Sequence, residues 1–275
     1  MTTVRDVLGW IEHAYPPRLA ADWDRVGLDC GDPDASVTSV AFAVDPTDAV
    51  VAEAVERGAD LLVTHHPLLL RGVTAVRRDQ PKGRLVMALL SAGISHVCAH
   101  TNADAATGGV NDALAEALGL GQVRPLEPDV LGGDDPVQGT GRIGVLAEPA
   151  TAEEVARRLA ARVPATAGGL RLGGDPRRVV RTVAVVGGAG DSYLDAAHRA
   201  GVDLYVTGDL RHHTAGELLA HDGAPALLDV PHFAAEWLWL PAAERLVRQR
   251  ADAAGAPLST YVSTINTDPW TLRVP

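Results

Sequence analysis

The chain has 275 residues, 47% of them hydrophobic, and a formal net charge of −11 at pH 7. This acidic balance argues against binding to nucleic-acid backbones, which are held by clustered lysines and arginines. The two cysteines, Cys30 and Cys98, form no CxxC pattern, so neither a disulfide framework nor a thiolate zinc site is expected. No apolar run approaches the ~20 residues of a membrane span, and the composition predicts a cytoplasmic α/β protein.

An amphipathic helix is expected near the start of the chain, because Val4, Val7 and Ile11 recur at helical spacing. Charged residues lie between them, so the segment does not resemble a signal peptide. Short apolar runs then alternate with helical patterns such as residues 48–57 and 110–118. This alternation predicts largely parallel sheets covered by helices. The expected strands are residues 39–44, 60–66, 94–101, 182–188, 203–209 and 225–230.

One segment of the sequence recurs. Residues 40–66 align without a gap to residues 183–209 at an offset of 143, and nine of the 27 positions are identical. Duplication is the favoured interpretation, and the alternative is that two β-α-β units converged on one strand pattern. The second copy carries Gly208-Asp209 where the first carries His65-His66. The fold itself therefore does not require these histidines.

The predicted fold class is α/β, with two similar lobes related by internal duplication. Residues 121–141 are rich in Gly, Pro and Asp and show little periodicity, which is typical of a boundary or an interlobe loop. We expect a first lobe over residues 1–125 and a second over residues 126–250. Residues 251–275 form a C-terminal segment that is assigned to neither lobe.

His65 and His66 end an apolar run at an expected strand end, where functional groups gather in parallel sheets. Pro67 biases His66 towards extended backbone, in which successive side chains point to opposite sides. The pair is thus expected to diverge and to suit two metal ions, one each. The alternative is that both histidines simply face solvent.

Two further strand ends carry metal-ligand residues. Asp104 follows the strand 94–101, and its alternative role is a helix cap or an Asx turn. His232 and Glu236 follow the strand 225–230, and a helix starting near Pro231 would place them on one face. Their alternative role is a surface ion pair. Together the five residues form a nitrogen and oxygen donor set without sulfur, which favours a hydrolytic two-metal site with Zn, Mn, Fe, Co or Mg.

Other histidines compete for a role beside the ligands. His100 is a candidate for orienting a carboxylate or for proton transfer, and His213, with its neighbour His212, for a supporting or substrate-contacting role. Arg71 and Arg211 are candidate phosphate contacts. The remaining histidines fall in ordinary contexts and receive no function: His13, His96, His198 and His221.

Six segments resemble, in order, the motifs of the Nif-three-like dinuclear metal proteins, a family of GTP cyclohydrolase type 2 homologues. The resemblance spans nearly the whole chain, although the large inserted domain of longer members is missing. The segments are DWDRVGLDCGDP (22–33), VTHHPLLLRG (63–72), AHTNADAATGGVNDALAEALGL (99–120), VTGDLRHH (206–213), DVPHFAAE (229–236) and STINTDPW (263–270).

The resemblance implies two divalent metal ions, held by His65 and His66, one each. Asp104, His232 and Glu236 would complete the cluster, with Glu236 bridging, in a cleft between two similar lobes. It also implies a toroidal homohexamer. Pro231 departs from the glycine that many members carry before the ligand histidine.

The activity that the family name implies is opening of the GTP imidazole ring by metal-activated water. The sequence thus predicts a dinuclear-metal-dependent hydrolase of a nucleotide or a phosphoester, with His100 and His213 as candidate proton-transfer groups. The alternative is a non-catalytic metal-binding scaffold or a metal-trafficking protein.

Overall fold

A computed structural model describes residues 1–129 and 138–274, which form two compact units. Unit 1 comprises residues 1–106 and 240–267, and unit 2 comprises residues 107–239 and 268–275. This division differs from the expected one, because helix α10 (Leu240–Ala253) packs in unit 1 against the N-terminal helix α1 (Val4–Ala14). Unit 1 is therefore built from two segments that are far apart in the chain.

The sheet of unit 1 has five strands and is largely parallel, as expected. Only the edge strand β1 runs antiparallel to its neighbour β4. In spatial order the strands are β1 (Gly27–Cys30), β4 (Ser95–Cys98), β3 (Leu61–Thr64), β2 (Ser39–Ala43) and β11 (Ser259–Val262).

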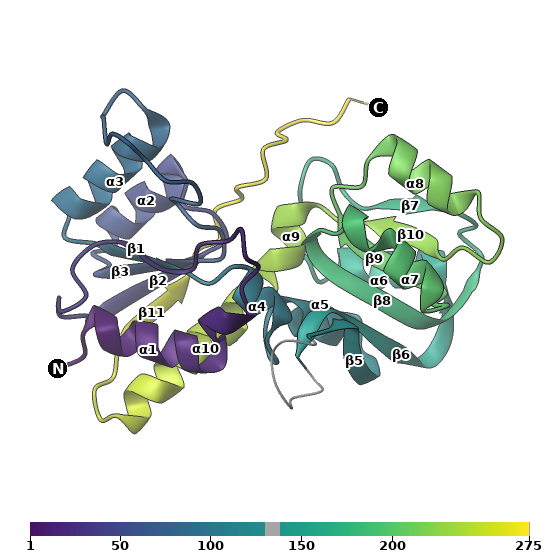
Figure 1. The fold of residues 1–275 in the computed structure, drawn as a ribbon, viewed down its shortest axis with the longest axis horizontal. Helices are drawn as coiled ribbons and strands as arrows, with labels where there is room; N and C mark the ends of the chain where they lie inside the picture. The colour runs from purple at the N-terminus through teal and green to yellow at the C-terminus, as the bar shows by residue number, and fades with distance from the viewer. Residues whose placement is uncertain (130–137, 275) are drawn as a thin grey trace. The chain divides into compact units, whose positions relative to one another are not determined.

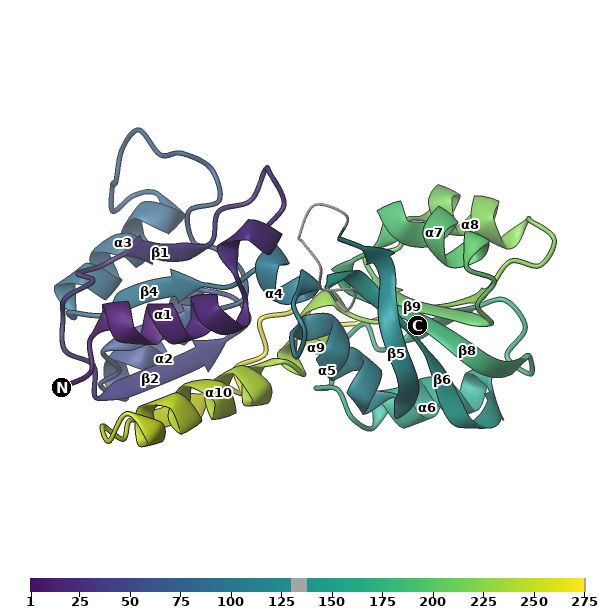
Figure 2. The same cartoon turned by 60° about the horizontal axis from the view of Figure 1, so that its bottom comes forward.

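Helices cover both faces of this sheet (Figure 1). Helices α2 (Asp48–Glu56) and α3 (Pro81–Ser91) pack on one face, where Val50, Val51 and Leu89 are buried against strand residues. Helices α1 and α10 lie side by side on the other face, as Figure 2 also shows. Thr3 caps α1 by accepting a hydrogen bond from the Asp6 amide, which stabilises the helix start.

Unit 2 contains a mixed sheet of six strands, so the expectation of largely parallel pairing is wrong there. Strands β8, β9 and β10 run parallel, and the other three pairings are antiparallel. In spatial order the strands are β5 (Leu120–Pro128), β6 (Gly139–Thr151), β8 (Val179–Ala189), β9 (Leu204–Gly208), β10 (Ala226–Asp229) and β7 (Arg171–Gly173).

The stretch expected as an interlobe loop, residues 121–141, instead contributes most of β5 and the start of β6. Its residues 130–137 lie outside the described residues. Pro125 is tolerated because β5 is an edge strand, whose second side needs no ladder hydrogen bonds. Gly121, Pro125 and Pro128, three of the residues that indicated a boundary, thus belong to an edge strand.

Helices of unit 2 cover both faces of its sheet. Helices α5 (Val110–Ala117) and α6 (Ala152–Ala160) bury Leu114, Val155 and Leu159 on one face, and α7 (Leu194–Arg199) and α8 (His212–Leu219) cover the other. The short helix α9 (His232–Trp237) follows β10. Within the described ranges, no helix has the length and apolarity needed to cross a membrane.

The two units share local geometry at the offset found in the sequence. Strands β2 and β3 pair in the same parallel register as β8 and β9. In each unit an aspartate before the second strand accepts hydrogen bonds from two backbone amides at the start of the first, Asp60 in unit 1 and Asp203 in unit 2. Each of these residues in unit 1 has its counterpart 143 positions later in unit 2. The strand pair Val40–Leu61 corresponds to Val183–Leu204, and the donors Thr38 and Ser39 correspond to Arg181 and Thr182.

Candidate metal centre

The histidine pair follows strand β3, and a hydrogen bond to Nδ1 fixes each ring. His65 is fully buried, and its Nδ1 donates to the Ala99 carbonyl oxygen at 2.9 Å. His66 is partly buried, and its Nδ1 donates to Asp45 Oδ1 at 2.7 Å. The other oxygen of Asp45 accepts from the Thr267 hydroxyl. An imidazole that donates from Nδ1 presents the lone pair of Nε2, the arrangement typical of metal-binding histidines.

His100 is held in the same way. It follows β4 at the start of helix α4 (Thr101–Ala105), and its Nδ1 donates to Asp24 Oδ1 at 2.8 Å. Asp24 is 5% exposed and also accepts from the amide and hydroxyl of Thr101. Burial opposes the charge of Asp24, but the hydrogen bonds from His100 and Thr101 outweigh it and hold the pKa of Asp24 below its usual range. His100 therefore faces a permanent carboxylate.

These three histidines converge in unit 1. Their ring centroids are 5.1 Å apart for His65 and His66, 5.2 Å for His65 and His100, and 5.4 Å for His66 and His100. One ligand atom from each lies within 4.8 Å of those of the others, close enough to hold one ion together. The chain bends at His65 and His66, and the assignment of each histidine to its own metal ion stays a prediction.

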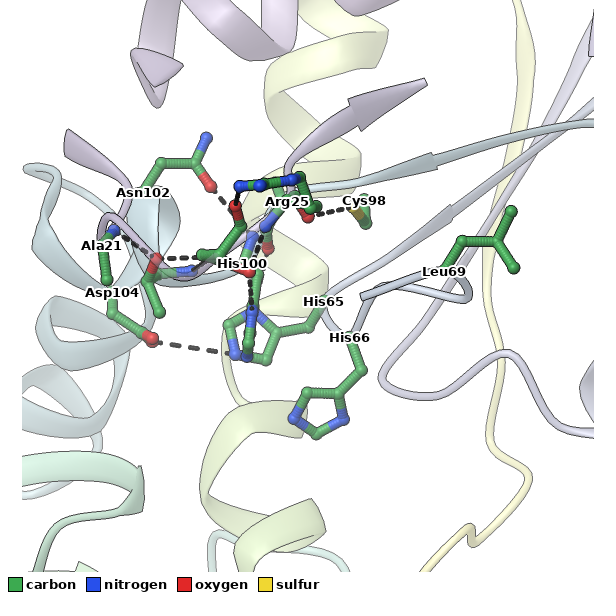
Figure 3. Close-up of polar contacts among 12 residues, drawn as sticks. Ala21, Arg25, His65, His66, Leu69, Cys98, His100, Asn102 and Asp104 are labelled. Atoms are coloured by element: carbon green, nitrogen blue, oxygen red, sulfur yellow. Dashed lines mark hydrogen bonds and ion pairs between the residues drawn. The ribbon is translucent and has the colours of Figure 1, made fainter. Parts of the chain in front are cut away.

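Asp104 lies inside α4, not at its cap, which is His100. Its Oδ1 is 3.7 Å from His65 Nε2, and Figure 3 shows the carboxylate directed at that ring. Asn102, a residue that the sequence analysis did not single out, supports the turn: its Oδ1 accepts from the His100 amide and its Nδ2 donates to the Tyr15 carbonyl. Three of the five predicted ligands thus lie together in unit 1.

The other two predicted ligands lie together in unit 2. His232 begins α9, and its Nε2 lies 2.9 Å from Oε1 of Glu236, which is 3% exposed. Asp209 Oδ2 accepts from His232 Nδ1 at 2.7 Å. Burial opposes protonation of His232, but the Glu236 and Asp209 carboxylates outweigh it and raise its pKa to about 11. A metal ion bound at Nε2 would have to displace that proton, so its affinity would fall at low pH.

Asp209 and Gly188 are functional candidates that spacing alone did not reveal. Asp209 occupies the repeat position of His66, and its positive φ of 56° turns the chain after β9. Gly188 belongs to the GGAG stretch, which resembles a weak phosphate loop in sequence. In the structure its φ is +68°, and a Cβ there would lie 2.4 Å from Glu236 Oε1. The glycine therefore makes room for the His232–Glu236 pair.

The donor set fits divalent metal ions. It consists of imidazole nitrogens and carboxylate oxygens, which suit Zn, Mn, Fe, Co or Mg. Burial raises the pKa of the Cys30 thiol to about 11 and that of the Cys98 thiol further, which favours the protonated form of both. The carbonyl and carboxylate partners on Nδ1 provide the supporting contacts that orient metal-binding histidines.

The remaining candidates lie at the start of α8 and in exposed segments. His212 and His213 are exposed, and their rings contact each other with centroids 5.2 Å apart. Arg211 donates from Nε to Asp191 Oδ2 at 2.6 Å, which competes with a phosphate-binding role. Arg71 is exposed in the loop between β3 and α3. Proton transfer by His213 stays a prediction.

The fold and these clusters define a class: α/β proteins with two mixed sheets covered by helices and candidate histidine–carboxylate metal sites. The chain belongs to the Duf34/NIF3 (NGG1p interacting factor 3) family, whose model matches residues 2–269.

Relatives and solved structures resemble the chain over its whole length. It is 48% identical to a GTP cyclohydrolase 1 type 2 homologue of Streptomyces coelicolor, covering 100% of this chain and 95% of that protein. It is 36% identical to a GTP cyclohydrolase 1 type 2 homologue of Mycobacterium tuberculosis, covering 97% and 96%. A crystal structure of a Bacillus cereus protein related to NIF3 matches with a TM-score of 0.90 at 24% identity, over 99% of each chain, which shows the shared fold.

Proposed function

We propose that this protein is a dinuclear-metal-dependent hydrolase. The proposal is carried by one observation, a hydrogen bond from Nδ1 that fixes each of four histidine rings. The acceptor is a carbonyl or carboxylate oxygen in every case, and the histidines are His65, His66, His100 and His232. Histidine rings held at Nδ1 in this way, with the buried carboxylates of Asp24 and Glu236 beside them, are typical of metal centres. Isolated surface histidines have no need of such partners.

The side chains divide into ligands and supporting groups. His65, His66, Asp104, His232 and Glu236 would hold two divalent ions. Such ions supply Lewis-acid polarisation of the substrate and a water of lowered pKa.

His100 is the best-placed proton-transfer group. Asp24 keeps its Nδ1 protonated, so His100 would accept or return a proton through Nε2. His213 stays a second candidate for this role.

The proposed substrate is an anionic nucleotide or another phosphoester. The names of the relatives point to opening of the GTP ring, and the local positive charge of two metal ions would offset the net charge of −11 for an anionic ligand. We also propose that the protein assembles as a homohexamer, as its resemblance to the family implies.

The test compares turnover by protein reconstituted separately with Zn, Mn, Fe, Co and Mg, using GTP and β-glycerophosphate as substrates. Glu236→Ala removes a buried carboxylate ligand and should lower metal-dependent turnover by about 100-fold or more. Glu217→Ala is the matched control, because Glu217 is exposed on α8 of the same unit. It should retain the wild-type rate.

The same experiment distinguishes a hydrolase from a non-catalytic metal-binding protein. Tight metal binding with no turnover above that of Glu236→Ala, for both substrates and all five metals, would overturn the hydrolase and favour a metal-binding scaffold or metal-trafficking protein.

A further inference from the structure

A large exposed aromatic ring lies beside the histidine cluster of unit 1. Trp23 is 61% exposed, and its ring meets that of His100 with centroids 5.8 Å apart and planes at 78°. His100 is in turn within 5.4 Å of His65 and His66, ring to ring. Because the contact with His100 is nearly perpendicular, it covers less of the indole than a stacked ring would.

The backbone on both sides of Trp23 is anchored. Before it, the Ala21 amide donates to the Thr101 hydroxyl at 2.9 Å. After it, the buried Asp24 carboxylate accepts from His100 and Thr101, and the Asp24 amide donates to the Ala21 carbonyl oxygen at 2.9 Å. Figure 3 shows Ala21 beside the turn that carries His100. The backbone that carries the indole is therefore anchored next to the cluster by the same groups that orient His100.

An exposed indole in a fixed position suits one kind of ligand. Planar rings stack on tryptophan with a gain that is large for one contact, and every nucleobase offers such a face. Cations are instead recognised by cages of several electron-rich aromatic rings. The ring beside Trp23 is an imidazole that belongs to a candidate metal cluster, which disfavours a cation.

We propose that Trp23 is a stacking platform for a planar heteroaromatic ring, so that the site takes nucleosides, nucleotides or similar heterocyclic compounds. The proposal rests on the proposed function in placing the hydrolysable part of the ligand at the histidine cluster. The new element is that Trp23, which is not a candidate metal ligand, selects the class of substrate.

The test measures equilibrium binding of guanosine, GMP and ribose 5-phosphate to metal-loaded protein. Trp23→Ala should weaken binding of guanosine and GMP by about 5- to 150-fold, and Trp23→Phe should keep most of it. Binding of ribose 5-phosphate and the metal content should stay at wild-type levels in Trp23→Ala. Trp270→Ala is the matched control, because Trp270 is 72% exposed in the C-terminal segment. It should bind all three compounds as the wild type does.

Intrinsic fluorescence provides a second readout. Guanosine should quench part of the emission of the five tryptophans in the wild type and in Trp270→Ala, but not in Trp23→Ala.

Several results would overturn the platform. They are wild-type protein that binds neither guanosine nor GMP, Trp23→Ala that binds them unchanged, and an equal loss of ribose 5-phosphate binding. A change of assembly state with binding intact would instead assign Trp23 to a contact with a second copy of the chain. Wild-type hydrolysis of β-glycerophosphate, which has no ring, tests the hydrolase separately. Either proposal can therefore fail while the other stands.

Discussion

Gly188 makes the His232–Glu236 pair possible because it has no side chain. It lies in β8 with φ at +68°, and an added Cβ would approach Glu236 Oε1 to 2.4 Å and His232 Nε2 to 3.2 Å. Both groups are candidate metal ligands, and Glu236 is buried, so its carboxylate has little freedom to move away. The residue thus links a backbone conformation to the geometry of the site.

Gly188→Ala is expected to abolish or strongly reduce metal binding in unit 2. Its left-handed backbone alone should cost about 1–2 kcal/mol of stability, and the clash adds displacement of the Glu236 carboxylate. Gly201→Ala is the matched control: Gly201 has φ at +64°, yet nothing lies within 4 Å of its Cβ position. Urea unfolding and elemental analysis should show that both variants are destabilised but that only Gly188→Ala loses metal. Equal metal content in the two would contradict this role.

The sequence locates the candidate ligands better than the residues that orient them. His65, Asp104 and His232 lie at or shortly after the ends of expected strands, so a simple rule about strand ends finds them. Asp24 and Asp45, which orient two of the rings, are far from them in sequence. Asp24 is 76 positions from His100, and Asp45 is 21 positions from His66. Aspartates are common in such loops, and only the folded register brings these two to Nδ1.

At the scale of elements, a chain of buried polar contacts joins three strands of unit 1 to the loop that carries the histidine pair. The Thr64 hydroxyl, at the end of β3, donates to the His66 carbonyl at 2.6 Å and lies 2.8 Å from His96 Nε2 in β4. His96 Nδ1 lies 3.1 Å from Asp29 Oδ2 in β1, and that oxygen accepts from the Leu68 amide at 2.7 Å. The loop is therefore held on both sides of His66.

His96 received no function from the sequence, yet in the structure it is the central member of this chain. His96→Phe keeps a ring of similar shape in the buried position and removes both polar contacts. We expect it to weaken metal binding by about 10- to 100-fold, as loss of a supporting contact does, and to cost about 1–3 kcal/mol of stability.

Calorimetric metal titration and urea unfolding of the His96→Phe protein measure the two effects. His13→Phe on α1, where the histidine is exposed, is the control and should change neither. Lower stability with wild-type metal affinity would mean that His96 supports the sheet only and does not position the loop.

Central parallel strands can be predicted from the sequence, and edge strands cannot. Apolar β-branched runs predict β2, β3, β4, β9 and β10 to within a few residues, because central parallel strands are buried on both faces. Strands β1, β5, β7 and β11 escape this rule because each lies at a sheet edge and is not continuously apolar. Residues 171–173 of β7, for example, read Arg-Leu-Gly. Their pairing is set by the neighbouring strand and not by their own pattern.

At the scale of the whole molecule, unit 1 depends on residues 240–267, which come after most of unit 2 in the chain. Strand β11 pairs in parallel with β2, from Ser259–Ser39 to Val262–Phe42, and α10 packs against α1, β2 and β11. Unit 1 therefore cannot complete its sheet until residues 240–262 are present, whereas the core of unit 2 comes from one continuous stretch. Lobes assigned by sequence order miss this arrangement, because no local sequence pattern shows that the chain returns to unit 1 at residue 240.

This arrangement predicts where a cavity in α10 will loosen the protein. Val247 is fully buried in α10, and Val206 is fully buried in β9 of unit 2. Each Val→Ala change should cost about 2 kcal/mol through lost burial and an incompletely filled cavity. If unit 1 and unit 2 unfold independently, each substitution lowers the stability of only the unit that contains it.

Native-state hydrogen exchange measures this effect. Backbone amides of residues 39–43 and 61–64 should exchange faster in Val247→Ala, and those of residues 183–186 and 204–208 in Val206→Ala. Equal acceleration of both sets in both variants would show that the chain unfolds as one cooperative body, and α10 would then stabilise the whole molecule and not unit 1 alone.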